Sequence, residues 1–144
     1  SAACIATISE MKKRNTINYC WKLGEKLFNS WNDITNSYGI NAKMIGYPIR
    51  MTLQCFDSHQ NESRELKALI LQEMISRRIF ISPGPSFISY SHSLDDIKKT
   101  LDSLHEICKF IQENSNQENF SSLLKGNLPK TVWTMDMKPI KKHS

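Results

Sequence analysis

The chain has 144 residues and a net charge of +5, and its 40% hydrophobic and 23% charged residues exclude an intrinsically disordered protein. No apolar run approaches the roughly 20 residues that cross a bilayer, and no cationic segment precedes the first apolar stretch, so we expect neither a membrane partner nor a secretory leader. Residues 1–124 carry 14 basic and 13 acidic residues, so the excess charge lies in residues 125–144. A nucleic-acid-binding domain needs a basic face on its folded body, and we therefore expect no nucleic-acid partner.

Two helices are predicted at the N-terminal end. Over residues 2–13 apolar residues recur every three positions, and over 16–37 they recur at steps of three and four, which places them on one helix face. Gly24 within the second helix is either a weak point or a place of close packing. Gly39 suits the left-handed conformation that ends a helix.

Strands are predicted next. Residues 41–46 and 50–56 alternate apolar and polar positions around Tyr47-Pro48, which favours an antiparallel pair. A short strand is expected at 79–81, and a third main strand at 86–91. The segment between them, Ser82-Pro83-Gly84-Pro85, is predicted to be a rigid loop because proline fixes φ.

Helices are expected to cover this sheet on one face. One begins near Asn61–Ser63, and a second spans 94–113 with Ser93 and Asp96 forming a capping-box pair. A short helix around 120–125 precedes an irregular tail over 126–144, in which Trp133 and Met135 are the residues most able to act as anchors. Because strands and helices mix without regular β-α-β alternation, the sequence predicts an α+β fold with a small, mostly antiparallel sheet of about three strands.

The four cysteines lack the spacing of a zinc site, so no metal is expected, and they are interpreted as free thiols in a reducing cytoplasm. They are Cys4, Cys20, Cys55 and Cys108.

Candidate functional residues gather around the proline-rich loop. The segment Ser82–Tyr90 either lines a pocket or is only a rigid connection between strands. Arg50 could bind a carboxylate as a fork, or could be an exposed charge at the end of a strand. His92 lies where functional groups are often found, or it bonds the turn with Ser89, Ser91 or Ser93. The sequence contains no P-loop and no dinucleotide-binding or nucleophile-elbow motif.

Several segments, taken in order, resemble class III aminotransferases. AACIATISEMKKR (2–14) with YCWKLGEKL (19–27) resembles the helix pair after the catalytic-lysine domain. GYPIR (46–50) with MTLQCF resembles the first strand pair, and ESRELKALILQEMISRRIFIS (62–82) resembles the next helix and strand. The strongest piece, SFISYSHSLDDIKKTLDSL (86–104), is typical of the glutamate-1-semialdehyde aminomutase branch. The resemblance covers residues 1–113.

The resemblance implies the small C-terminal domain of the aspartate-aminotransferase fold. It divides the chain into an inter-domain helix (1–15), the small domain (16–125) and a basic tail (126–144). The family acts as a homodimer on a small amino substrate with pyridoxal 5'-phosphate, and its Schiff-base lysine would lie upstream of Ser1, in a large domain of the same chain. The fragment alone is therefore expected to bind no cofactor and to be inactive.

The resemblance places the loop around Gly84–Ser86 at the substrate. Together with the two residues singled out above, the substrate-contact candidates are Gly84, Pro85, Ser86, Arg50 and His92. Two departures from the family pattern stand out. Many relatives have glycine where this chain has Arg78, so a different helix cap is expected there, and no carboxylate-binding arginine is recognisable near 86–91, which favours the aminomutase-like branch. The alternative is a self-contained α+β protein-interaction module. The two hypotheses differ on helix 2–13: the first predicts that its apolar face is exposed, and the second that it is buried in the domain or in a self-dimer.

Overall fold

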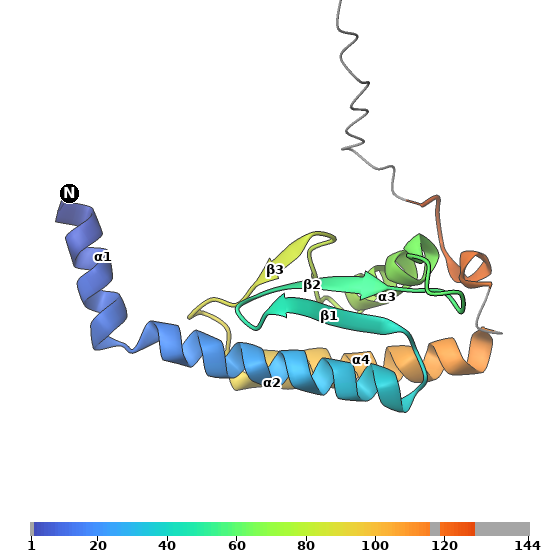
Figure 1. Ribbon diagram of the computed structural model, residues 1–144, viewed down its shortest axis with the longest axis horizontal. Coiled ribbons are helices and arrows are strands. Elements are labelled where there is room, and N and C mark those ends of the chain that lie inside the picture. Colours follow the sequence, from blue (N-terminus) through green and yellow to red (C-terminus); the bar gives the residue numbers. More distant parts are fainter. Residues whose placement is uncertain (1, 116–118, 129–144) are drawn as a thin grey trace, which may run out of the picture.

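The computed structural model describes residues 2–115 and 119–128. A three-stranded antiparallel sheet, ordered β1-β2-β3, packs against helices α2, α3 and α4. The helices α2 (Thr16–Ser37) and α4 (Leu94–Asn114) run side by side along the sheet, while α3 (Arg64–Ser76) contacts β2 (Figure 1). The predicted α+β class with a small antiparallel sheet is confirmed.

The sheet is built on one hairpin. The strands β1 (Ala42–Tyr47) and β2 (Arg50–Cys55) pair antiparallel, and β3 (Pro85–Phe87) pairs with the first half of β2. Alternate residues of β2 are buried, as the sequence pattern predicts.

Two strand predictions are wrong. The third strand contains only Pro85–Phe87 rather than 86–91, because the chain turns at Ser89, whose carbonyl accepts the backbone N–H of His92 at 3.2 Å. Residues 79–81 form no strand, because the N–H of Ile79 donates to Met74 O and closes the end of α3, and Ile81 is buried in the core. Pro85, which was predicted to belong to the rigid loop, lies in β3 instead, and Ser86 lies in a strand as predicted.

Helix α2 fits closely against β1 and the hairpin turn. A Cβ atom at Gly24 would overlap the carbonyl oxygen of Pro48, so close packing is the correct reading of this glycine. At the outer edge of the sheet, the Asn32 amide donates to Met44 O at 3.1 Å and accepts from Met44 N at 2.9 Å. This pairing satisfies backbone groups that an edge strand would otherwise leave open. Gly39, at φ 67°, ends the helix as predicted.

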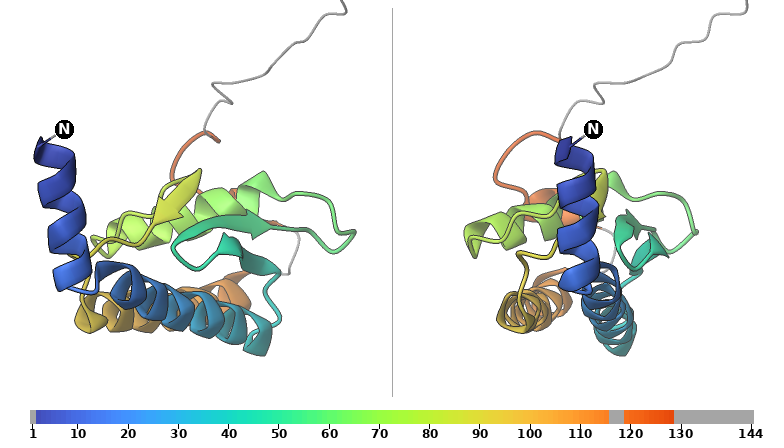
Figure 2. Two further views of the ribbon diagram at one scale, coloured as in Figure 1. Left: turned by 60° about the vertical axis from the view of Figure 1, so that its left-hand side comes forward. Right: turned by 90° about the vertical axis from the view of Figure 1, so that its left-hand side faces the viewer.

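Helix α1 (Ala2–Lys13) projects from the rest of the molecule (Figures 1 and 2). The chain bends at Asn15, which has a left-handed φ of 51°, before α2 begins. None of the residues of α1 is buried, and α2 is the element that it contacts most. The predicted helix is therefore confirmed, and its apolar face is exposed within the single chain.

The remaining elements complete the core. Helix α4 begins with the predicted capping box of Ser93 and Asp96. The 3-10 helix η1 (Phe120–Leu123) packs against α3 and is shorter than the helix expected over 120–125. Trp133 and Met135 lie outside the described residues. Within residues 2–115 and 119–128, no helix combines the length and apolarity that crossing a bilayer requires.

Candidate functional site

The connection from α3 to α4 carries most of the predicted site residues, and hydrogen bonds at the end of α3 fix where it begins. At the end of α3, the N–H of Arg78 donates to Ile75 O at 2.9 Å and the N–H of Ile79 donates to Met74 O at 3.0 Å. These two bonds form a Schellman cap, whose left-handed position is filled by Arg78 at φ 62°. The tighter or different cap expected at this residue is therefore not found, because Arg78 adopts the left-handed conformation that usually selects glycine.

Arg50 and Phe87 lie next to each other on the outer face of the sheet. They are directly paired residues of β2 and β3, and the guanidinium carbon of Arg50 lies 5.9 Å from the centre of the Phe87 ring. Tyr47 pairs with Arg50 from the other side, so an aromatic residue flanks the arginine on each neighbouring strand. Arg50 is exposed, and no ion pair with another described residue engages it. A cation held over an aromatic ring in this way keeps its donors available to an anion.

Ser86 points to the opposite face of the sheet. It pairs with Met51, whose side chain is buried in the core. Its hydroxyl oxygen is buried and has no hydrogen-bond partner among the described residues. An unsatisfied buried polar group costs about 1–3 kcal/mol. The five predicted contact residues therefore do not converge on one face, because Ser86 is separated from Arg50 and Phe87 by the sheet itself.

His92 bonds the turn that follows β3. Its Nδ1 accepts the backbone N–H of Ser89 at 3.0 Å and lies 3.1 Å from the Ser89 hydroxyl. Because the N–H can only donate, Nδ1 is the acceptor in this contact. Of the two roles considered for His92, these contacts match the structural one, in which the histidine bonds the turn through Ser89.

The same turn is attached to α2. The Tyr19 hydroxyl donates to His92 O at 2.7 Å, and the Tyr19 ring meets the Tyr90 ring edge-on with centroids 5.1 Å apart. Gly84 is fixed locally by its N–H, which donates to the Ser82 hydroxyl at 3.2 Å. Sequence reasoning did not identify the Tyr19 contacts, since they join residues more than 70 positions apart.

The N-terminus of α4 is already occupied by a carboxylate. Asp96 accepts the Ser93 N–H at 2.8 Å and the Ser93 hydroxyl at 2.7 Å. The hydrogen bond from the Ser93 hydroxyl, followed by that from its backbone, holds the pKa of Asp96 below its usual range. With Asp95 beside it, this helix end carries negative charge, which disfavours an anion such as phosphate.

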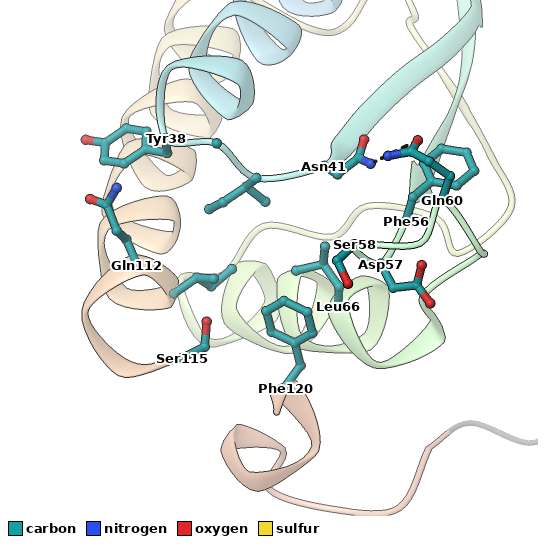
Figure 3. Close-up of a pocket in the computed structure, with 13 residues that line it drawn as sticks. Tyr38, Asn41, Phe56, Asp57, Ser58, Gln60, Leu66, Gln112, Ser115 and Phe120 are labelled. Atoms are coloured by element: carbon teal, nitrogen blue, oxygen red, sulfur yellow. Dashed lines mark hydrogen bonds between the residues drawn. The ribbon is translucent and has the colours of Figure 1, made fainter. Parts of the chain in front are cut away.

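A hollow that the sequence did not predict lies at the other end of the strands. Its volume is about 280 Å³, and it lies between the ends of α2 and α4, the loop after β2, and η1 (Figure 3). Its wall includes Tyr38, Phe56, Gln112 and Phe120. Asp57, also in the wall, is held in its own loop, where the backbone N–H of Asn61 lowers its pKa most.

The thiols do not add reactivity to the region. Burial raises the pKa of Cys55 and of Cys108 to about 12, so both stay protonated at neutral pH and are poor nucleophiles. The predicted free state holds for all four cysteines, of which only Cys4 is exposed. Over the described part of the chain, no group of three or more His, Cys, Asp or Glu side chains is arranged to hold a metal ion.

The sequence matches no protein-family model and no curated protein. The structure is similar to part of the FumI protein of Sphingopyxis sp. MTA144, solved in a PLP internal aldimine form. The TM-score is 0.64 at 16% identity, over 85% of this chain and 30% of that one. It is also similar to a beta-phenylalanine aminotransferase from Variovorax paradoxus, with TM-score 0.59 and 16% identity over 67% of this chain and 24% of that one.

An omega-transaminase from Sphaerobacter thermophilus gives TM-score 0.53 and 14% identity over 62% of this chain and 23% of that one. The chain therefore spans less than a third of the length of these solved structures. At such low identity the likeness establishes the fold, which is that of part of a transaminase chain.

Proposed function

We propose that this chain is the small domain of a pyridoxal-phosphate-dependent aminotransferase or aminomutase, and that a large domain upstream of Ser1 carries the Schiff-base lysine. The likeness to solved transaminases supports the class of enzyme. The exposed apolar face of α1 is the observation that carries the proposal. The domain hypothesis predicts this exposure, whereas a self-contained domain that covered the helix would have buried the face.

The face of α1 is suited to contact with another domain. Ile5, Ile8 and Met11 are 66%, 53% and 37% exposed and lie on one side of the helix. A groove of about 470 Å³ in the angle between α1 and α2 adds Ile17 to the same surface. Apolar side chains gathered in this way mark an interaction site. This surface supports the inter-domain role that we propose for residues 1–15.

The described residues do not fit a pyridoxal-phosphate site of their own. A Schiff-base lysine must lie in a pocket that shields it from water, but the described lysines are exposed except for Lys67, which is half-buried. The Ser63 side chain accepts the N–H of Leu66 in α3, and Ser93 with Asp96 forms the capping box of α4. Acidic side chains also lie in the first turn of both helices, so neither helix end favours a phosphate group. The cofactor is therefore assigned to the proposed large domain, and the isolated chain is expected to bind none.

The small domain would then supply contacts to the substrate. We assign this role to Arg50 and to the segment Gly84–Ser86, with His92 holding the turn that follows. Arg50 supports a carboxylate contact because its guanidinium is exposed between two aromatic residues. The Ser86 hydroxyl is buried on the other face of β3 and has no partner among the described residues, so its assignment rests on the sequence resemblance alone. The sequence of 86–104 favours the glutamate-1-semialdehyde aminomutase-like branch, which implies a homodimeric, cytoplasmic enzyme.

The test compares the 144-residue chain with the gene product that includes the upstream residues. The longer protein should gain the visible absorption of lysine-bound pyridoxal phosphate, and the 144-residue chain should not. Ile5→Asp with Ile8→Asp should weaken cofactor retention and activity in the longer protein. Ala3→Asp with Ala6→Asp introduces the same two charges on the opposite side of α1 and should leave both unchanged. An upstream reading frame without a lysine domain would overturn the proposal.

The protein-interaction module remains the second candidate, because the α1 surface would also suit a second copy of the chain. Sedimentation of the 144-residue chain distinguishes the two. A stable dimer that dissociates on Ile5→Asp with Ile8→Asp would favour the module. A monomer would favour the domain.

A further inference from the structure

We propose that the groove on the outer face of α3 binds the C-terminal segment of this same chain, residues 129–144, through the Trp133 side chain. The groove has a volume of about 450 Å³, and its lining is mostly apolar. It is formed by α3, by the connection to β3, and by the chain after η1; its apolar side chains are those of Ala68, Leu71, Ile75, Phe80, Ile81, Pro83 and Leu124.

Helix α3 has two apolar faces, and the fold covers only one of them. The inner face contributes Leu66, Leu69, Ile70 and Met74 to the core. The outer face carries Ala68, Leu71 and Ile75, and Ile75 is 58% exposed. A helix that is apolar on both sides is normally buried on both sides. We therefore expect the outer face to be covered by another segment. Among the described residues, the chain after η1 lies against it, but only along one edge of α3.

That edge is formed by the chain that leads into the C-terminal segment. The Gln72 side chain donates to Leu123 O at 3.2 Å and accepts the N–H of Lys125 at 2.7 Å. This pair of bonds holds the backbone after η1 against α3, so that Gly126 and Asn127 form part of the groove wall. The described chain ends at Leu128, directly beside the groove.

The segment beyond Leu128 has the length and the chemistry for this groove. Trp133 follows Leu128 by five residues, a reach of up to roughly 17 Å at about 3.3 Å per residue. This is close to the length of α3, about 20 Å for 13 residues. Trp133 is joined by Val132 and Met135, and no charged side chain lines the groove. A short connection also gives the segment a high effective concentration, which favours it over a separate partner.

Tryptophan quenching in the 144-residue chain tests the proposal. Trp21→Phe leaves Trp31, which is 0% exposed, and Trp133. In this background acrylamide quenching should stay close to that of Trp21→Phe with Trp133→Phe, which reports Trp31 alone. Phe80→Ser alters the groove at a residue that is 78% exposed and should raise quenching severalfold. Phe87→Ser, at a residue 62% exposed on the sheet, is the matched control and should not.

Three results would overturn the proposal. Trp133 could be freely quenched in the parent background, which would place it in water. It could be protected but insensitive to Phe80→Ser, which would place it elsewhere on the protein. Its protection could fall on dilution together with the sedimentation coefficient, in which case a second copy of the chain holds the segment.

Discussion

The contact between Gly24 and the hairpin turn provides the sharpest test of the fold around Arg50. A Cβ atom at position 24 would overlap Pro48 O and lie 3.3 Å from Ile49 N. Both are backbone atoms of the turn that joins β1 to β2, and the turn is closed by the pairing of Tyr47 with Arg50. The obstacle therefore cannot be relieved by rotating a side chain, and α2 or the turn must shift.

Two opposing effects set the size of the loss in Gly24→Ala. Alanine gains about 1 kcal/mol over glycine within a helix. Adding a methyl group to a closely packed site costs about 1–3 kcal/mol, and the upper end applies because backbone must move. The expected result is a net loss of about 2 kcal/mol from a folding free energy of about 5–15 kcal/mol.

Urea unfolding followed by circular dichroism measures this loss. The midpoint should fall while the dependence on urea concentration stays the same. Gly126→Ala is the matched control, because a Cβ atom there would meet no atom within 4 Å, and its stability should be equal or slightly higher. A Gly24→Ala protein as stable as the parent would show that helix propensity prevails and that the turn is not held against α2.

Three further predictions test separate features. Arg78→Gly should raise the free energy of unfolding by about 1 kcal/mol in urea titrations, because glycine has no steric penalty at φ 62°; a decrease would show that the arginine side chain stabilises the fold. The lowered pKa of Asp96 stabilises the fold above the unfolded carboxyl pKa, about 3.9, and this contribution is lost as the pH falls through the folded pKa. Asp96→Asn should therefore reduce stability at neutral pH and flatten its loss in acid, whereas an unchanged pH profile would contradict the capping role. Iodoacetamide at pH 8 should modify Cys4 in the native protein but not Cys55 or Cys108, as peptide mapping would show, because burial raises their thiol pKa values to about 12; equal labelling would contradict the buried core.

Local signals in the sequence were enough to predict most of the elements. The apolar spacing of α2 and α4, the capping box at Ser93 and the left-handed Gly39 are all set by residues within a few positions of one another. The antiparallel pairing of β1 and β2 was predictable for the same reason, since a short turn forces neighbouring strands together. The class of fold followed from these elements and their order.

The length of β3 and the geometry of the candidate site were decided by contacts that are distant in sequence. Residues 86–91 alternate like a strand, but β2 offers partners only for Pro85–Phe87. His92 then accepts from Ser89, and Tyr19 of α2 holds its carbonyl. Sequence reasoning named Arg50, Ser86 and His92 together, because it could not determine which face of the sheet each would occupy.

The sequence by itself determined the helices, the hairpin and the α+β class, because these depend on apolar periodicity and on turn and cap residues that act over a few positions. Only the tertiary structure decided that Gly24 packs against Pro48 and that Arg50 and Ser86 lie on opposite faces of the sheet. It alone also showed that α1 and the outer side of α3 remain uncovered. Burial is a property of what surrounds a residue in space, and a periodic apolar pattern does not specify which surface covers it.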